Sequence, residues 1–424
     1  MPLQLRVIAI CVVVHYEKSL SLLILIGSNV RIDIDIEDKQ GEPEFLTSWK
    51  VLSGYRVIIG RSCGMRKILL GLCILLLASV TLMPHASAAA TGQEVLPPST
   101  STWEASFDWR PVVINTGSSF MMWYSGEANN QVDQIGLATS KDGISWSRYG
   151  QQPVLSIGAS GQWDSGSVNE AWVIQDGGGY KMWYGGQTYD TQNQTLFTWE
   201  IGYATSPDGI NWTKYSGNPV FTPGVSGSWD DKYVHRPIIV TTGSSYTMYY
   251  RGENSKQVAQ VGIATSTDGI HWTRKGTISP IPNGTWDANW NSLYSVTATS
   301  GGYLMAYEGA STSTSLNYNI GFASSADGMN STPYAMNPVI APNIAGIAFD
   351  SQGVGDPMVI TVGNQYYVYY DGWTAAVTGL GLAILPISQF PVPEFASPEI
   401  LTAAVMLMSA ALLLSRRRLN LSCL

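Results

Sequence analysis

Residues 163–186 read WDSGSVNEAWVIQDGGGYKMWYGG, and their pattern of aromatic, acidic and glycine positions occurs five times along the chain. Counting begins at the acidic residue that follows the first aromatic ring. Every copy then has a tyrosine at position +20 and a glycine at position +22. The five starting residues are Glu104, Asp164, Asp230, Asp287 and Asp350. Because this spacing is kept without a gap, we interpret the middle of the chain as an internal repeat.

A second shared stretch, such as Ile135–Ser140, follows in each copy and ends in an Asp-Gly turn in the first four. Asp accepts hydrogen bonds from the turn backbone and Gly adopts positive φ, so the pattern indicates strands joined by tight turns. Four strands in each copy of about 60 residues predict an all-β fold, a five-bladed β-propeller with four antiparallel strands per blade, over residues 91–390. The fifth copy stops after Leu385, and we expect residues 93–97 (QEVLP) to supply its missing strand.

Composition narrows the class of protein. Only 13% of the 424 residues are charged, against roughly 25% in ordinary soluble domains. Residues 91–390 hold 22 acidic and 11 basic residues, a balance of −11 that argues against a nucleic-acid binder. The four cysteines lie outside residues 91–390, which excludes a disulfide-stapled domain and a thiolate metal site there.

The segment before the repeat has the features of a secretory signal. Met65-Arg66-Lys67 is followed by an apolar run from Ile68 to Leu82 and by small residues up to Ala90. We expect residues 65–90 to form a signal helix, the alternative being a buried helix or a retained anchor. Since signals stand at the N-terminus, we also expect translation to begin at Met65, with residues 1–64 an upstream extension absent from the natural protein.

The other end, residues 391–424, combines Pro393-Glu394-Phe395, an apolar run from Ile400 to Leu414 and Arg416-Arg417-Arg418. Phe395–Leu414 approaches the ~20 residues of a membrane helix, and the arginines would remain inside the cell. This tail resembles the archaeal PEF sorting signal, a resemblance that implies processing by an archaeosortase. A plain C-terminal membrane anchor is the alternative. Both place residues 91–390 outside the cell, attached to the outer face of its membrane.

Positions that break the repeat indicate a site. In a propeller, the start of the first strand lies beside the end of the second, at one face of the ring. Position +6, at the start of the first strand, is occupied by Arg110, Glu170, Arg236, Leu293 and Asp356. Position +21, at the end of the second, is occupied by Ser125, Gly185, Arg251, Glu308 and Asp371. These charged residues should converge on one mouth of the axial channel, as a ligand pocket or, alternatively, as ion pairs that plug it.

Residues beside these positions add to the predicted site. Asp108 replaces the valine of three other copies, and His235 precedes Arg236. We predict three catalytic carboxyl groups, those of Asp108, Glu170 and Asp356. The predicted substrate-binding residues are Arg110, His235, Arg236, Arg251, Glu253, Glu308, Asp371 and Trp373. Sugar rings would stack on rim aromatics, for which the candidates are Trp109, Trp172, Trp290 and Trp373.

The phrases Met122-Trp123-Tyr124-Ser125-Gly126 and Ile201–Gly209 are similar to blade signatures of the clan that contains glycoside hydrolase families 32, 43, 62, 68, 117 and 130. In family 43 an Asp of the first blade is the general base and an acid of the second positions substrate, which correspond here to Asp108 and Glu170. The family's third acid, a Glu general acid, is replaced by Arg236, and Glu253 or Glu308 could take its place. In family 130 an acid of the second blade donates the proton and basic residues bind phosphate.

These observations predict a cell-surface carbohydrate-active protein, a glycoside hydrolase or phosphorylase that uses axial carboxylates on a glycan. The alternative is a non-catalytic carbohydrate-binding or adhesion propeller of the cell envelope. Glycosidic cleavage needs one carboxylic acid of raised pKa and one carboxylate, ~5–5.5 Å apart for retention or ~6.5–9.5 Å for inversion. No cofactor and no catalytic metal are expected, although backbone carbonyls and Asp side chains would suit a structural calcium ion.

Overall fold

The computed structural model describes two compact units of the chain, one within residues 1–85 and the other within residues 86–424. The described residues of the first unit are 11–16, 19–26, 30–37, 47–51 and 56–59. Those of the second unit are 92–99, 103–127, 132–190, 195–278, 281, 284–311, 318–343, 348–374 and 378–390. The predicted signal helix at 65–90 and the predicted tail at 391–424 lie outside the described residues. Within the described residues, no helix has the length and apolar character needed to cross a membrane.

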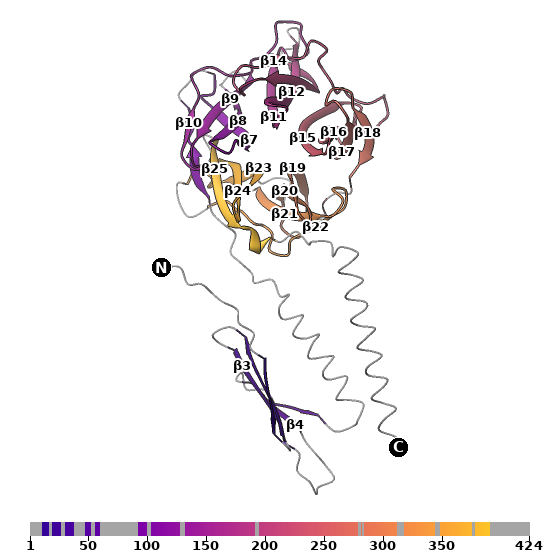
Figure 1. Ribbon diagram of the computed structural model, residues 1–424. Coiled ribbons are helices and arrows are strands. Elements are labelled where there is room, and N and C mark those ends of the chain that lie inside the picture. The colour runs from indigo at the N-terminus through magenta and orange to yellow at the C-terminus, as the bar shows by residue number, and fades with distance from the viewer. Residues whose placement is uncertain are drawn as a thin grey trace. The chain divides into compact units, whose positions relative to one another are not determined.

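The first unit contains an antiparallel sheet that the sequence pattern did not predict. Its strands follow one another in chain order, each paired with the next (Figure 1). They are β1 (Cys11–Tyr16), β2 (Ser19–Ile26), β3 (Val30–Glu37), β4 (Thr47–Val51) and β5 (Arg56–Ile59).

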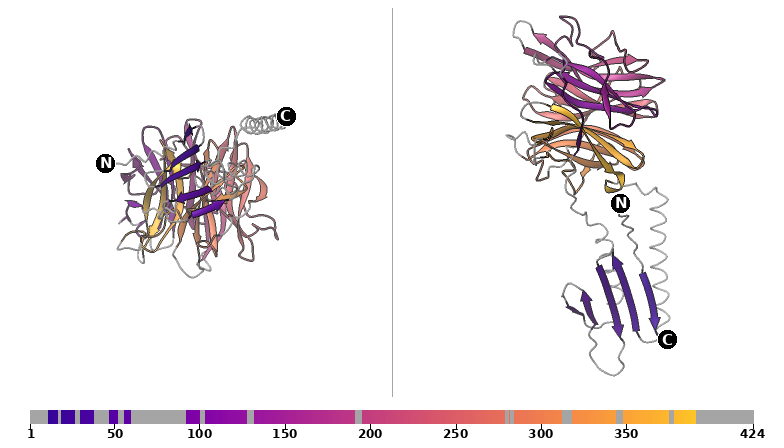
Figure 2. Two further views of the ribbon diagram at one scale, coloured as in Figure 1. Left: turned by 90° about the horizontal axis from the view of Figure 1, so that it is seen from below. Right: turned by 90° about the vertical axis from the view of Figure 1, so that its left-hand side faces the viewer.

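The second unit is a ring of five blades, called blades 1 to 5, each with four strands in antiparallel order (Figure 1). Blades 1 and 5 are joined into one eight-stranded sheet by a parallel bridge between Phe107 and Thr378. Figure 2 shows the same sheets from two further sides. Blade 1 contains β7 (Phe107–Asn115), β8 (Phe120–Glu127), β9 (Asp133–Ser140) and β10 (Trp146–Arg148). Blade 2 contains β11 (Ser167–Asp176), β12 (Gly179–Asp190), β13 (Thr195–Ser206) and β14 (Thr213–Lys214). Blade 3 contains β15 (Tyr233–Thr242), β16 (Ser245–Glu253), β17 (Ala259–Ser266) and β18 (Thr273–Thr277). Blade 4 contains β19 (Trp290–Thr299), β20 (Gly302–Ala310), β21 (Asn319–Ser325) and β22 (Ser331–Pro333).

Blade 5 closes the ring with strands from both ends of the repeat region. It contains β23 (Gly353–Val362), β24 (Gln365–Trp373) and β25 (Thr378–Pro386), and a short 3-10 helix (Ile387–Gln389) follows. Its fourth strand is β6 (Gln93–Leu96), which pairs antiparallel with β25. The predictions of an all-β fold, of four antiparallel strands per repeat and of this closure are therefore confirmed.

The constant spacing within the repeat is explained by a hydrogen bond that recurs in blades 1, 2, 3 and 5. The tyrosine at +20 donates its hydroxyl to the acidic residue that begins the same blade, for example Tyr124 to Glu104 at 2.6 Å and Tyr250 to Asp230 at 2.9 Å. The glycine at +22 leaves room for the aromatic ring before that acid: a Cβ on Gly186 would lie 2.3 Å from Trp163. The starting acids thus tie the second strand to the beginning of the blade.

The Asp-Gly turns join neighbouring blades. Asp208 accepts backbone hydrogen bonds from the residues after its glycine, as predicted, and Gly209 has a φ of +76°. The turn's glycine carbonyl then accepts a hydrogen bond from position +19 of the preceding blade, 2.9 Å from Trp123 to Gly209 and 2.7 Å from Trp183 to Gly269. Blade 5 has no such turn, and blade 4 correspondingly has the small Ala306 at +19.

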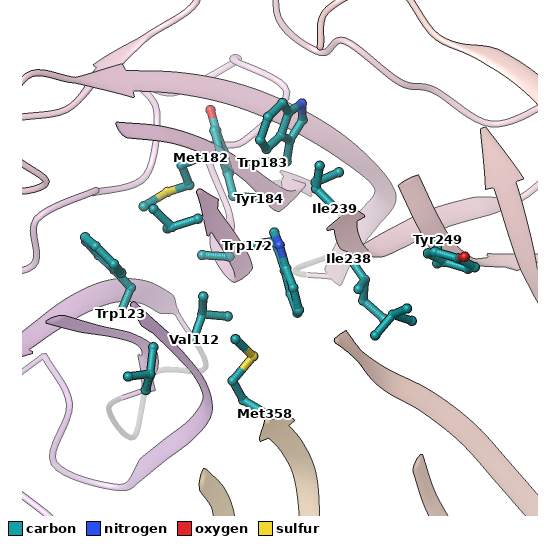
Figure 3. Packing of buried hydrophobic residues seen from close by; sticks show 14 of the residues in the cluster. Val112, Trp123, Trp172, Met182, Trp183, Tyr184, Ile238, Ile239, Tyr249 and Met358 are labelled. Carbon is teal, nitrogen blue, oxygen red and sulfur yellow. The ribbon is translucent and has the colours of Figure 1, made fainter. Parts of the chain in front are cut away.

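The centre of the ring is filled by the side chains at position +8. They are Val112, Trp172, Ile238, Ser295 and Met358, all of them buried. Figure 3 shows the four apolar members meeting within the core cluster. Trp172 is therefore a core residue, and its prediction as a sugar-stacking residue is wrong. This apolar layer closes the axial channel, so a ligand site at the mouth has a solid floor.

Replacing Tyr369 with Phe tests the contact that joins blade 5 to blade 1. The buried hydroxyl of Tyr369 donates to the Gly143 carbonyl at 2.7 Å, and Trp146 donates to the same oxygen at 3.1 Å. Because the carbonyl keeps one partner, we expect the free energy of unfolding to fall by about 1 kcal/mol in urea titrations. Tyr149→Phe, at an exposed tyrosine of blade 1, is the control. Equal stability of the two variants would contradict the role of this contact.

Candidate active site

The first strand of each blade contains an irregularity that builds the site. In blades 1, 2, 3 and 5 the pairing with the second strand breaks after position +5 and resumes at +8. The +6 residues at these breaks have left-handed backbone, with φ of 53° at Arg110, 51° at Glu170, 57° at Arg236 and 47° at Asp356. Non-glycine residues rarely adopt this conformation, and it is concentrated at functional sites. The bulge redirects each +6 side chain out of the strand's normal alternation.

Blade 4 has a shorter irregularity, which the sequence did not reveal. Its register shift spans Leu293 to Ser295, so a single residue, Tyr294, remains unpaired. Leu293 was expected at the axial position, but it pairs with Tyr307 and is buried in the core. Tyr294 occupies the site instead.

Tyr294 is surrounded by charged groups of three other blades. The guanidinium carbons of Arg110 and Arg236 lie 5.2 and 4.8 Å from the centre of its ring. Arg236 Nη1 donates to the Tyr294 hydroxyl, which is also within hydrogen-bonding reach of the Glu308 and Asp356 carboxyl groups. Tyr294 therefore connects a basic side of the site on blades 1 to 3 with an acidic side on blades 4 and 5.

Glu170 is the anion of the basic side. Its Oε1 accepts from Arg236 Nε at 2.9 Å and lies 3.8 Å from Arg110 Nη1, while its Oε2 accepts from the Arg236 backbone N–H at 3.1 Å. Burial alone would raise the pKa of Glu170. In the acidic range, where His235 is protonated, its charge and those of Arg110 and Arg236 outweigh burial and hold the pKa of Glu170 well below its ordinary value. Glu170 is thus a permanent carboxylate, unsuited to donating a proton.

His235 rests between Glu170 and an aromatic ring. Its Nδ1 lies 2.8 Å from Glu170 Oε2, and its ring stacks on Trp199 at 4.7 Å between centres. Burial lowers the pKa of His235 to about 4, although Glu170 opposes this shift. The imidazole is therefore neutral at pH 7, with the Nδ1 proton directed to Glu170. This leaves Nε2 as a hydrogen-bond acceptor, since no partner for it occurs among the described residues.

The acidic side consists of Glu308, Asp356 and Asp371. Glu308 Oε2 accepts a hydrogen bond from the Asp356 backbone N–H at 3.1 Å, and Asp371 pairs across the ladder with Gly355. Burial and then the charge of Asp356 raise the pKa of Glu308 to about 8. Burial also raises the pKa of Asp356, against the charges of Arg236 and Arg110, and it raises that of Asp371 well above its ordinary value. The cluster thus holds protonated carboxyl groups at neutral pH.

The two sides enclose a cavity of about 460 Å³. Its charged and imidazole lining comprises His235, Arg236, Arg251, Glu253, Glu308, Asp356 and Asp371. Its aromatic lining comprises Trp109, Trp199, Tyr233, Trp290, Tyr294, Tyr318 and Trp373. Most residues predicted to bind substrate therefore meet in one hollow, together with one of the three predicted catalytic carboxyls, Asp356.

The other two predicted catalytic carboxyls do not line the cavity. Asp108 is completely buried and paired with Arg148, which also contacts Glu104 at 3.0 Å. Glu170 and Arg110 form the buried layer beneath the cavity, against Tyr294. Of the three predicted catalytic carboxyls, only that of Asp356 therefore lines the cavity, while Glu170 accepts hydrogen bonds from Arg236 and has His235 Nδ1 within 2.8 Å, both residues of its lining.

Three lining aromatics besides Tyr294 were not predicted. Trp199 belongs to the β12–β13 hairpin, which is longer than its counterparts in the other blades. The additional residues between Tyr184 and the next shared stretch were the only sequence signal for it. Tyr233 begins β15 and Tyr318 precedes β21, where a single aromatic residue carries no distinguishing pattern. Among the described residues, no group of three or more His, Cys, Asp or Glu is placed to hold a metal ion.

Sequence comparisons find relatives that match part of the chain. No family model matches the chain. Two uncharacterised proteins from strains of Mycobacterium tuberculosis are 31% identical over 169 residues, 39% of this chain and 53% of theirs. A 1,2-beta-oligomannan phosphorylase from a Thermoanaerobacter species is 27% identical over 145 residues, 33% of this chain and 47% of its own. The chain thus spans about half the length of the curated relatives it matches.

Solved structures match over most of the chain. A glycosyl hydrolase from Bacteroides ovatus is 19% identical, with a TM-score of 0.52 over 72% of this chain and 97% of its own. Further matches include a family-43 glycoside hydrolase and a structure from the GH130 family of mannoside phosphorylases. The structural neighbours are therefore glycoside-hydrolase-like propellers, and this likeness establishes the fold.

Proposed function

We propose that this protein is a glycoside hydrolase of the cell surface that cleaves a glycan in the cavity between the basic and acidic sides. The observation that carries the proposal is the acidic side itself. Three carboxyl groups of raised pKa share a hollow lined by seven aromatic rings. Aromatic faces bind sugar rings, and carboxyl groups of unequal pKa perform glycosidic cleavage.

The roles follow from the proton affinities. Glu308, with its pKa raised to about 8, carries a proton at neutral pH and acts as the general acid toward the leaving oxygen. We assign the role of the adjacent carboxylate to Asp356, which lies beside Glu308 and near the charges of Arg236 and Arg110, which oppose the rise of its pKa. It either accepts a proton from the attacking water or attacks the anomeric carbon itself, and these routes give opposite stereochemistry. The pKa of Asp371 is also raised, by burial and then by the charges of Asp356 and Glu308.

Phosphorolysis is a second candidate, favoured by the basic side. Arg236, Arg251 and neutral His235 line the cavity opposite the acids, and the curated relatives include a phosphorylase. A phosphate ion held by the two guanidinium groups would replace water as the attacking group. The proposed location at the outer face of the cell membrane rests on the signal-like segment 65–90 and the tail 391–424. A membrane helix and processing by an archaeosortase remain proposals on the same basis.

A glycosidase screen of the purified full chain tests this function. Aryl glycosides and polysaccharides are incubated with and without inorganic phosphate, and the anomeric proton of the product is followed by NMR. Release of free sugar without phosphate would support hydrolysis, and release of sugar phosphate would support phosphorolysis. Binding of a glycan without turnover under any condition would contradict the enzyme proposal and support a non-catalytic carbohydrate-binding propeller.

A further inference from the structure

Arg251 differs from every equivalent residue of the ring. It occupies position +21 of blade 3, where the other blades have Ser125, Gly185, Glu308 and Asp371. It lies near the end of β16 and lines the cavity on the basic side. Since +21 pairs with the residue before the bulge, here His235, its side chain belongs to the same mouth of the ring as the acids.

The guanidinium of Arg251 has no hydrogen-bond or ion-pair partner among the described residues. The other two arginines of the basic side, Arg110 and Arg236, do have partners. Arg236 donates to Glu170 at 2.9 Å and to Tyr294, and Arg110 lies 3.8 Å from Glu170. Burial and the charge of Arg236 lower the pKa of Arg251, so its surroundings oppose the charge it carries. A guanidinium held in this way supplies donors to a ligand.

Hydrogen-bond donors on the basic side remain unused without a ligand. The nearest buried carboxylate, that of Glu170, already accepts hydrogen bonds from Arg236 and His235. Glu253 is two residues beyond Arg251 and lines the cavity, yet no ion pair joins the two. Arg110 Nη1 and Nη2 also lack hydrogen-bond acceptors among the described residues. The basic side therefore has a surplus of hydrogen-bond donors among the described residues.

We propose that Arg251 binds a carboxylate carried by the sugar, so that the substrate class is an acidic oligosaccharide built from uronic acid units. This inference rests on the proposed function and specifies its substrate. A carboxylate accepts two parallel hydrogen bonds from a guanidinium, a geometry that a neutral hydroxyl cannot satisfy. Trp199 and Tyr233 on the same side offer faces for the sugar ring, and the glycosidic oxygen then lies toward the protonated acids of blades 4 and 5. Inorganic phosphate is the other source of an oxyanion for Arg251.

Calorimetric binding to the full-length protein tests the inference. The probes are oligomers of galacturonic and glucuronic acid, the same oligomers with carboxyl groups reduced to alcohols, and inorganic phosphate. We expect an acidic oligomer to bind about 10- to 100-fold more tightly than its reduced counterpart, and Arg251→Gln to remove that difference. Arg251→Lys should keep part of this difference in affinity, because the lysine ammonium retains the positive charge but lacks the two parallel donors of the guanidinium. Lys256→Gln, at an exposed lysine beyond the same strand, should change nothing.

The outcomes separate this inference from the proposed function. Equal binding of the acidic and reduced oligomers, or tight acidic binding that survives Arg251→Gln, would overturn the role of Arg251 and leave glycan hydrolysis intact. Phosphate binding that depends on Arg251, without a preference for acidic sugars, would also overturn it and assign the residue to phosphate. Failure of every oligomer to bind correctly folded protein, as judged by circular dichroism, would overturn the acidic-sugar inference, while the glycosidase screen on other glycans decides the proposed function separately.

Discussion

Replacing Glu308 with Gln should lower kcat/KM on a cleaved glycan by about 10²- to 10⁴-fold, the contribution of a positioned general acid. The glutamine amide would keep the size of the side chain and an oxygen that accepts the Asp356 N–H, but it has no acidic proton to give. The fold should be unchanged, since the backbone contact is preserved. Steady-state kinetics on the best substrate of the glycosidase screen provide the measurement.

The pH profile gives an independent test of the same residue. Because the pKa of Glu308 is raised to about 8, the protonated form predominates below that pH. Activity should therefore be present at neutral pH and decline as pH rises through about 8, and Glu308→Gln should abolish this decline in its residual activity. Glu94→Gln, at an exposed glutamate of β6, is the control and should retain normal kinetics. Normal kinetics of Glu308→Gln would show that Glu308 is not the general acid.

Replacing Glu170 with Gln should be the most destabilising change in the site, with a loss of about 3–5 kcal/mol in the free energy of unfolding. The carboxylate lies between Arg110 and Arg236, and all but Arg236 are almost completely buried. Without the negative charge, two guanidinium groups remain in a poorly solvated layer. Urea titration at pH 7 measures the loss, and Glu253→Gln, which removes the same charge from a group without an ion pair, should cost less than about 0.5 kcal/mol.

Two further measurements separate this charge effect from a general loss of packing. Adding Arg110→Met to Glu170→Gln removes one uncompensated cation, so the double variant should lose less than the sum of the two single losses. The pKa of Glu170 is below its ordinary value, so its stabilising contribution is present above the ordinary pKa of a glutamate, about 4.3, and disappears as pH falls through the folded value. Additive losses together with an unchanged pH dependence would show that the ion pairs contribute nothing.

The repeat made the architecture predictable from the sequence. Tyr124 and Gly126 have equivalents in all five blades because each position has one packing task, and identical tasks recur at identical spacing. The mouth of the ring was predictable for the opposite reason, since residues such as Arg236 and Asp356 break the pattern where scaffold residues repeat. Their convergence required only the pairing of consecutive strands.

The remaining features depend on local backbone geometry that spacing does not encode. Tyr294 was missed because blade 4 has a one-residue bulge, which shifts the axial position from Leu293 to its neighbour. Asp108 was placed in the site because its strand reaches the mouth, but Arg148 of the fourth strand holds its carboxyl away from the cavity. Trp172 was predicted to be an exposed ring near the rim, but it occupies position +8, whose side chains are buried at the centre of the ring.

The pairing of β6 with β25 has a consequence for biogenesis. A ribosome makes Gln93–Leu96 almost three hundred residues before their partner, so the circle stays open until synthesis of the last blade is nearly complete. Until then, the exposed edge of every partial assembly is available for pairing with another nascent chain. A chaperone or a membrane channel that delays compaction would protect the polypeptide during this interval, and deletion of β6 should increase aggregation.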